Sequence, residues 1–458
     1  MLRLLLAALL MVLTWQVQAG AQDAPATRPA PLPKPETLEL QDGDSIVFLG
    51  DSITHQHLYT QYVEDYFYTH FPQMRLKLHN AGVGGARAWD ALQRFDEDVA
   101  AYKPKYVTIL LGMNDGSYRP YDDATFQTYR QDMTKLLDRL AEIGAQAIPM
   151  TPTMFDSRAR RLYGKPGTPE ESLQLYNSVL AYYGTWLREV AQDRGLGFVD
   201  MWSPLNSATQ EAREKDASFT MIRDAVHPGP DGQVIMATAI VQDLELPNVV
   251  SRVQLQVVPQ AKGTAVNATL ADVTGDANGV SFTLTAKSLP WVLPADAQQG
   301  VKMTHLGHKF SREMLQVTGL APGQYELKIN DIVVGKYSDV RLADSIELES
   351  NDKTPQYQQA LKVAELNKAR NDGPVAKLRG EWSRFQAYAR LKRDHEAQPD
   401  NQELAKKFQA AEKSIEGMSE RVAQHNADAR KIEDEIFKIN QPVALHYVLE
   451  KVPAKVKK

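Results

Sequence analysis

Four side chains in three short motifs have the chemistry for nucleophilic catalysis. Ser52 follows the apolar run 45–49 within Gly-Asp-Ser-Ile-Thr, and Asp224 and His227 lie three residues apart in a later loop. A serine that attacks an ester needs a His to remove its proton, and that His needs a carboxylate to fix its tautomer. Asn114, in Gly-Met-Asn-Asp, follows another apolar run and can donate a hydrogen bond to an oxyanion. The set predicts acyl transfer through a serine nucleophile.

The order and content of these motifs resemble the SGNH hydrolases, also called GDSL esterases, whose four sequence blocks are named for Ser, Gly, Asn and His. The resemblance implies that Ser52 is the nucleophile and that Asp224 and His227 complete the triad. It implies an oxyanion hole made by the backbone N–H of Ser52, the side chain of Asn114 and a glycine N–H. The first block reads Asp-Ser-Ile where the family's other name has Asp-Ser-Leu, which exchanges one aliphatic residue for another.

The glycine of the second block has two candidates in the stretch Asn-Ala-Gly-Val-Gly-Gly. Gly85 is the expected oxyanion donor, and Gly82 is a rival in a different register. Taken singly, other residues of the set also have plain structural explanations. Ser52 could cap a helix that begins near Gln56, and His227 could be a loop residue before a Pro-Gly-Pro turn. The chain has no Gly-x-Ser-x-Gly pentapeptide, which argues against the alternative of an α/β-hydrolase.

The elements that must position these motifs alternate between apolar runs and helical patterns. Strands separated by helices predict an α/β fold with a parallel sheet covered on both faces. The catalytic motifs then fall at the carboxyl ends of strands, where open α/β sheets hold their ligands. The resemblance adds a flavodoxin-like α/β/α sandwich. The predicted strands are 45–49, 76–80, 106–111, 145–150 and 196–200, and the clearest predicted helices are 56–71 and 124–143.

The chain of 458 residues is too long for a single ordinary core, so two or three domains are expected. Residues 1–21 have an early positive charge, an apolar stretch and a small-residue exit, which predicts a secretory signal peptide. Residues 22–37 form a Pro-rich linker and 38–247 the hydrolase domain. No later apolar stretch approaches the length of about 20 residues that a membrane span requires. The expected location is therefore secreted, periplasmic or extracellular, with no stable membrane anchor.

Composition narrows the partners and cofactors. The net charge is −5 and no basic patch with interleaved aromatics stands out, so nucleic acid is a poor candidate partner. Without cysteine, the chain carries neither a disulfide nor the lipid-bearing Cys of a lipoprotein. The mechanism implies no organic cofactor and no metal. His55 and His57 do not suggest a metal pair, because side chains two apart on a helix face different ways.

The second half of the chain changes pattern twice. Residues 248–353 have short alternating segments that predict a β-rich accessory domain, either a carbohydrate-binding module or a packing domain. Residues 354–441 carry heptad-spaced apolar residues, which predict an inserted antiparallel helical hairpin with a coiled-coil seam. The triplet Asp-Gly-Pro at 372–374 is expected to break its first arm. Residues 442–458 read as a strand that returns to the β-rich domain, followed by a basic tail.

We expect a secreted esterase that hydrolyses short-chain acyl esters, with acetyl groups on a polysaccharide as the first choice. The alternatives are a lipase or lysophospholipase, and a surface interaction protein that self-associates through the hairpin. Internal pairing of the hairpin arms is favoured, because both arms carry the seam. Candidate substrate contacts lie beside the motifs, although ordinary packing or surface ion pairing explains each of them equally well. These candidates are Asp51, Arg87, Trp89, Tyr118 and Arg119.

Overall fold

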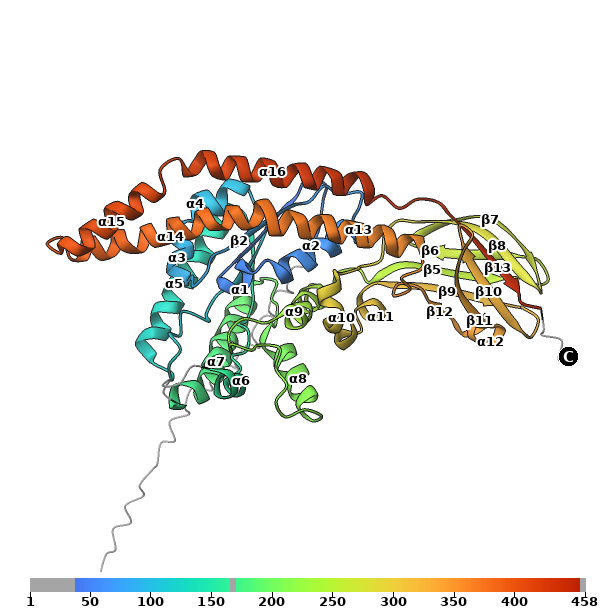
Figure 1. Cartoon of the computed structure of the whole chain (residues 1–458), viewed down its shortest axis with the longest axis horizontal. Coiled ribbons are helices and arrows are strands. Elements are labelled where there is room, and N and C mark those ends of the chain that lie inside the picture. The colour runs from blue at the N-terminus through green and yellow to red at the C-terminus, as the bar shows by residue number, and fades with distance from the viewer. Residues whose placement is uncertain (1–37, 165–169, 454–458) are drawn as a thin grey trace, which may run out of the picture.

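The computed structural model describes residues 38–164 and 170–453 (Figure 1). The predicted signal peptide 1–21, the linker 22–37 and the end of the basic tail lie outside the described residues. The described chain contains a parallel sheet flanked by helices, a β-rich region and a long helical hairpin that extends from the β-rich region along the hydrolase domain (Figure 1). The fold class expected from the sequence is therefore confirmed.

The hydrolase sheet has four parallel strands in the order β2-β1-β3-β4. Every residue of β1 and β3 is buried, as expected for strands covered on both faces. The predicted fifth strand at 196–200 is reduced to one parallel bridge between Met150 and Val199. The strands are β1 Ser45–Gly50, β2 Lys77–Gly82, β3 Tyr106–Leu110 and β4 Gln146–Pro149.

The helix predicted at 56–71 is wrong at its start. The chain forms a short helix directly after β1, and His57 then takes a left-handed conformation with φ of 65°. The long helix therefore begins after His57, at Leu58. The helices of this domain are α1 Ser52–His55, α2 Leu58–His70, α3 Ala88–Gln93, α4 Phe95–Asp98, η1 Ala100–Tyr102, α5 Asp123–Glu142, α6 Ser157–Tyr163, α7 Glu170–Arg194, α8 Trp202–Arg213 and α9 Pro230–Asp243.

The β-rich region has two sheets, with the strand orders β11-β10-β13-β8-β7 and β12-β9-β5-β6. Its apolar core is separate from the core of the hydrolase domain. The last strand, β13, lies between β10 and β8, so the chain returns to this region after the hairpin. The strands are β5 Val249–Gln256, β6 Lys262–Val266, β7 Ala268–Asp276, β8 Gly279–Ala286, β9 Arg312–Thr318, β10 Gln324–Ile329, β11 Ile332–Ser338, β12 Ile346–Glu347 and β13 Leu445–Lys451.

The segment between β8 and β9 packs on the hydrolase domain. Trp291 is 3% exposed, belongs to the hydrolase core, and donates its indole N–H to the carbonyl of Tyr62 at 2.8 Å. Trp291 is therefore a packing residue and does not present a sugar-binding surface. The short helices of the β-rich region are η2 Ala295–Ala297, α10 Gln298–Thr304, α11 Leu306–Phe310 and α12 Asp339–Asp344.

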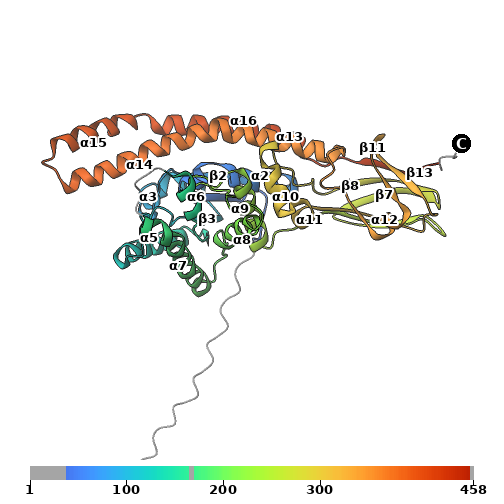
Figure 2. The same ribbon diagram turned by 60° about the horizontal axis from the view of Figure 1, so that its bottom comes forward.

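The hairpin crosses the hydrolase domain and projects beyond it (Figures 1 and 2). Its first arm continues through 372–374, contrary to expectation. The π-helical turn η3 accommodates Pro374 there, because its wider backbone pairing tolerates the missing N–H. The second arm is interrupted at Gly417, which has φ of 66°. The first arm is α13 Pro355–Arg370, η3 Asn371–Val375 and α14 Ala376–Ala397, and the second is α15 Gln402–Ser414 and α16 Met418–Ile439.

Buried charges attach the first arm to the hydrolase domain. Nη1 and Nη2 of Arg379 donate to the carboxylate of Asp98 at 2.8 and 2.7 Å, and Arg94 donates to the same carboxylate at 2.6 Å. These three side chains are fully buried. Arg370 forms a second buried ion pair with Glu64 at 3.1 Å.

No helix of the described residues has both the length and the apolar composition that a bilayer crossing needs.

Candidate active site

Ser52 lies at the sharp turn between β1 and α1, and it begins the helix. Asp51 caps this helix, because its side chain accepts the N–H of Ile53 at 2.9 Å. Ser52 is only partly exposed, whereas Asp51 is 1% exposed. The turn thus presents the serine hydroxyl at the carboxyl end of the sheet and keeps the preceding carboxyl buried.

Ser52, His227 and Asp224 form a continuous hydrogen-bonded relay. The Nε2 atom of His227 lies 2.7 Å from Ser52 Oγ, and its Nδ1 atom lies 2.7 Å from Asp224 Oδ2. The other carboxylate oxygen of Asp224 accepts the backbone N–H groups of Val226 and His227. Partial burial raises the pKa of Asp224, but these hydrogen bonds outweigh it and hold that pKa below its usual value. Asp224 is therefore ionised at neutral pH.

Asn114 lies beside this relay with its amide group held on both sides. Its Oδ1 atom accepts the hydroxyl of Tyr118 at 2.9 Å, which turns Nδ2 the other way. Nδ2 donates to the carbonyl of Ala86 at 3.1 Å and to Asp51 Oδ2 at 3.3 Å. Tyr118 and Asp51 thus orient the amide. Asp51 was expected to be a substrate contact, but its burial argues against that role.

The two candidate glycines differ in what surrounds them. A Cβ atom on Gly82 would lie 2.4 Å from the backbone nitrogen of His55, and its N–H already donates to Asn80 Oδ1 at 2.9 Å. Gly82 therefore allows β2 and α1 to approach closely. Gly85 has φ of 68° and open space where a Cβ would lie. Within the described residues, the backbone N–H groups of Gly85 and Ser52 have no acceptor.

A cavity of about 680 Å³ opens beside Gly85 and Asn114. Four of the candidate substrate contacts line it, namely Arg87, Trp89, Tyr118 and Arg119, while Asp51 does not. Arg119 is paired with Asp122, so ion pairing accounts for part of its position. The cavity wall is mixed in character, with aromatic rings next to charged side chains.

Two arginines of the hairpin also line this cavity, and neither was among the residues predicted to lie at the site. Arg390 binds the buried carboxylate of Asp90 with two nitrogens at 2.7 Å. The guanidinium of Arg393 lies 4.4 Å from the centre of the Trp89 ring. Both contacts join residues about 300 positions apart in the chain, so no local pattern could have revealed them.

Asp115 is a further residue that the sequence reasoning missed. Its carboxyl accepts the N–H of Ala88 at 2.9 Å and that of Gly112 at 3.0 Å, which ties the third motif to the start of α3. Burial raises the pKa of Asp115 to about 7, and burial raises that of Asp51 to about 7 as well. Its place directly after Asn114 in Gly-Met-Asn-Asp was the available signal.

His55 and His57 lie with ring centres 5.6 Å apart and tilted planes. His55 accepts the backbone N–H of Gly84 at its Nδ1 atom, at 3.2 Å. Burial lowers the pKa of His55 to about 4, so the ring is neutral and able to accept. Among residues 38–164 and 170–453, no three His, Cys, Asp or Glu side chains are grouped to hold a metal ion.

Comparison with known proteins assigns the family. Residues 48–235 match the GDSL-like lipase/acylhydrolase family. An acetylxylan esterase from Geobacillus stearothermophilus is 23% identical over 229 residues, which cover 45% of this chain and 96% of the esterase. The solved structure of a gut microbial diltiazem-metabolizing enzyme is 26% identical and superposes with a TM-score of 0.75, covering 92% of this chain and 99% of that enzyme. Its similarity therefore extends beyond the hydrolase domain into the second half. The domain that contains residues 48–235 belongs to the SGNH hydrolase family, also called GDSL esterases, and the chain is an ester hydrolase.

Proposed function

We propose that this protein is a serine esterase that removes short acyl groups, acetyl groups foremost, from a carbohydrate. The observation that carries the proposal is the relay of two 2.7 Å contacts from Ser52 through His227 to Asp224. This geometry meets the requirement that nucleophile and base lie within hydrogen-bond reach and that a third group orients the base.

In the proposed reaction, Ser52 Oγ attacks the ester carbonyl carbon while Nε2 of His227 takes its proton. Asp224 accepts the N–H at Nδ1 and stabilises the imidazolium that forms. His227 then protonates the leaving alcohol as the C–O bond breaks, which leaves an acyl group on Ser52. Water, deprotonated by His227, attacks this acyl-enzyme and releases the carboxylic acid.

The oxyanion of each tetrahedral intermediate would be bound by the backbone N–H groups of Ser52 and Gly85 and by Nδ2 of Asn114. The two backbone donors have no acceptor within the described residues, so they are available to the oxyanion. Asn114 would rotate or shift slightly from Ala86 and Asp51, which it binds at 3.1 and 3.3 Å. Donors of this kind are usually the largest electrostatic contribution to acyl transfer.

The cavity beside these donors supports a hydrophilic alcohol as the leaving group. Trp89 is half-buried and Tyr118 is 38% exposed, so both offer ring surface on which a sugar can stack. Arg87 is exposed at the same wall and can donate to hydroxyl groups. A long apolar acyl chain would have to leave water for a wall that carries charges, which disfavours the lipase alternative.

The acetylxylan esterase from Geobacillus stearothermophilus among its relatives supports acetylated polysaccharide as the substrate class. The pattern at residues 1–21 supports secretion before the enzyme meets such a polymer.

The test compares the enzyme with its Ser52→Ala variant on p-nitrophenyl esters from acetyl to palmitoyl, and then measures acetate release from acetylated xylan and pectin. We expect activity that falls steeply beyond short acyl chains, and a loss of about a million-fold in Ser52→Ala, as in other triads. Ser207→Ala, at an exposed serine on α8, is the matched control and should keep full activity.

Three results would count against the proposal. Near-normal activity in Ser52→Ala would remove the nucleophile assignment. An optimum with palmitoyl ester would replace the carbohydrate esterase with a lipase. Activity on p-nitrophenyl acetate without acetate release from any acetylated glycan would leave a short-chain esterase with a different alcohol.

A further inference from the structure

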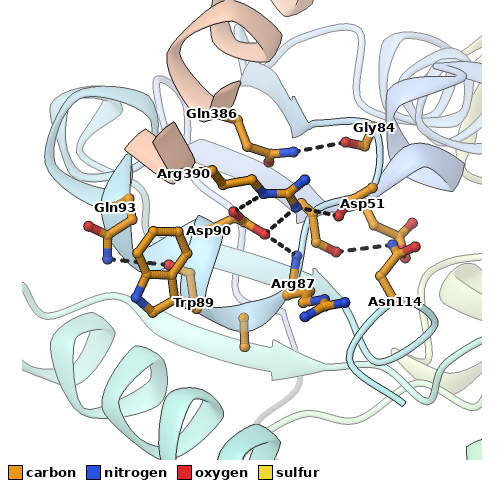
Figure 3. A network of polar contacts seen from close by, with 12 residues as sticks. Asp51, Gly84, Arg87, Trp89, Asp90, Gln93, Asn114, Gln386 and Arg390 are labelled. Carbon is orange, nitrogen blue, oxygen red and sulfur yellow. Dashed lines mark hydrogen bonds and ion pairs between the residues drawn. The ribbon is translucent and has the colours of Figure 1, made fainter. Parts of the chain in front are cut away.

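The first arm of the hairpin reaches the loop that carries Gly85. Gln386 of α14 donates from Nε2 to the carbonyl of Gly84 at 2.9 Å (Figure 3). Arg390, one helical turn later, donates from Nη2 to the carbonyl of Gly85 at 2.7 Å. Two consecutive carbonyls of the loop are therefore bound by one helix face, which comes from a part of the chain about 300 residues away.

The bond to Gly84 has a direct geometric consequence. The carbonyl of Gly84 and the N–H of Gly85 belong to the same planar trans peptide, so they point in opposite directions. When Gln386 holds the carbonyl on the hairpin side, the N–H of Gly85 must point away from the hairpin. Glycine flanks this peptide on both sides, and without Cβ atoms the peptide would otherwise rotate easily.

Neighbouring contacts fix the peptides on either side. The N–H of Gly84 donates to His55 Nδ1 at 3.2 Å. Arg390 is itself held by the buried Asp90, whose carboxylate also accepts the N–H of Arg87 at 2.8 Å (Figure 3). The loop is thus bound at one end by α1, the helix that begins at Ser52, and at the other end by α3 and the hairpin.

We infer that Gln386 and Arg390 of the hairpin are positioning residues that aim the Gly85 N–H at the oxyanion. The inference rests on the proposed function, since it assigns to the hairpin the orientation of one proposed oxyanion donor. It makes the hairpin a working part of the hydrolase site and not only a packing element.

Gln386 is the better residue to test, because Arg390 also lines the cavity and could touch substrate. Gln386 is 5% exposed and lies behind the loop, outside the residues that line the cavity. Gln386→Met keeps the length and helix preference of the side chain and removes the donor. The matched control is Gln409→Met, at an exposed position of α15 on the same hairpin.

In Gln386→Met we expect kcat for p-nitrophenyl acetate to fall about 10- to 100-fold, less than the roughly 100- to 1000-fold cost of deleting an oxyanion donor. KM should stay within about twofold, since the donor acts on the transition state. Affinity for a phenylboronic acid, a tetrahedral analogue, should fall in parallel with kcat/KM. The thermal midpoint and circular dichroism spectrum should match those of Gln409→Met.

Unchanged kcat in folded Gln386→Met would overturn the inference, and so would a rise in KM alone. If Gln386→Met does not fold, Gln386→Asn serves instead, because it keeps the amide but shortens its reach, and full activity there would also overturn the inference. Ser52→Ala separates the two levels of the argument. If Ser52→Ala is inactive while Gln386→Met and Gln386→Asn are normal, only the positioning role fails. If Ser52→Ala is active, the proposed function fails.

Discussion

The hairpin has an inner half, which consists of α13, η3, the start of α14 and α16, and an outer half at its tip, which consists of the end of α14 and α15. The two halves differ in what surrounds them. In the inner half, Arg379 and Trp382 of α14 are 0% and 3% exposed against the hydrolase domain. In the outer half, every residue of α15 is described and none of them is buried. Aromatic stacking holds this part together, since the ring of Phe408 stacks on that of Tyr388 with ring centres 5.7 Å apart. The same heptad pattern therefore accompanies two different environments.

The heptad pattern of apolar residues therefore predicts that the two helices pair, but it does not predict which part of the pair is buried against another domain. Buried ion pairs bind the inner half to the hydrolase domain, and removal of one partner of such a pair leaves a buried charge uncompensated. The outer half gains only partial burial and exposed ion pairs, which contribute little to stability. The hairpin is thus part of the enzyme near α2 and α3 and an ordinary solvated helix pair at its tip.

The largest effect is expected for Arg379→Met. Loss of this guanidinium leaves the buried carboxylate of Asp98 with Arg94 and His79 as its side-chain partners among the described residues. We expect the free energy of unfolding to fall by about 3 kcal/mol, the lower end of the range for a broken buried pair, since Arg94 remains. Urea denaturation measures it. Lys431→Met, at a side chain that is 73% exposed and pairs with Asp428 at the surface of α16, is the control. An equal loss of unfolding free energy in both variants would erase the distinction between buried and exposed charge.

A second test uses pH. His79 is buried, and this burial lowers its pKa from 6.5 to about 4. Between those values the unfolded chain binds a proton at His79 that the folded chain does not, so stability present above pH 6.5 is lost as the pH falls toward 4. In His79→Gln that loss should be smaller by at most about 3 kcal/mol.

The measurement for His79→Gln is the urea midpoint from pH 7 to pH 4. His446→Gln, at an exposed position of β13, should keep the slope of the parent protein. Parallel slopes for all three proteins would mean that protonation of His79 is not linked to unfolding of the inner interface.

The smallest effect is expected at the tip. Phe408→Ala removes ring stacking on Tyr388 and His395, whose ring centres lie 5.7 and 5.3 Å away. The ring is half-buried, so we expect the free energy of unfolding, measured by urea denaturation, to fall by about 1 kcal/mol, and we expect kcat and KM to stay unchanged. A fall in kcat without unfolding would show that the outer half of the hairpin also acts on the active site.

Much of the hydrolase fold followed from local sequence. Unbroken apolar runs predicted β1 and β3 because strands buried on both faces leave no polar period. The helix predicted at 56–71 is present as α2, but its predicted start was wrong because a left-handed residue at His57 has no strong sequence signal. The predicted break at 372–374 was wrong because a π-helical turn contains Pro374 and continues the arm from α13 to α14.

The sequence by itself determined the chemistry available to this protein. The types and order of Ser52, Asn114, Asp224 and His227 indicate a serine hydrolase, because each step of acyl transfer needs one of those groups. Only the tertiary structure decided which residues hold that machinery in place. Gln386 and Arg390 meet the Gly84–Gly85 loop across about 300 residues of chain, and hydrogen bonds at that separation depend on how whole domains dock.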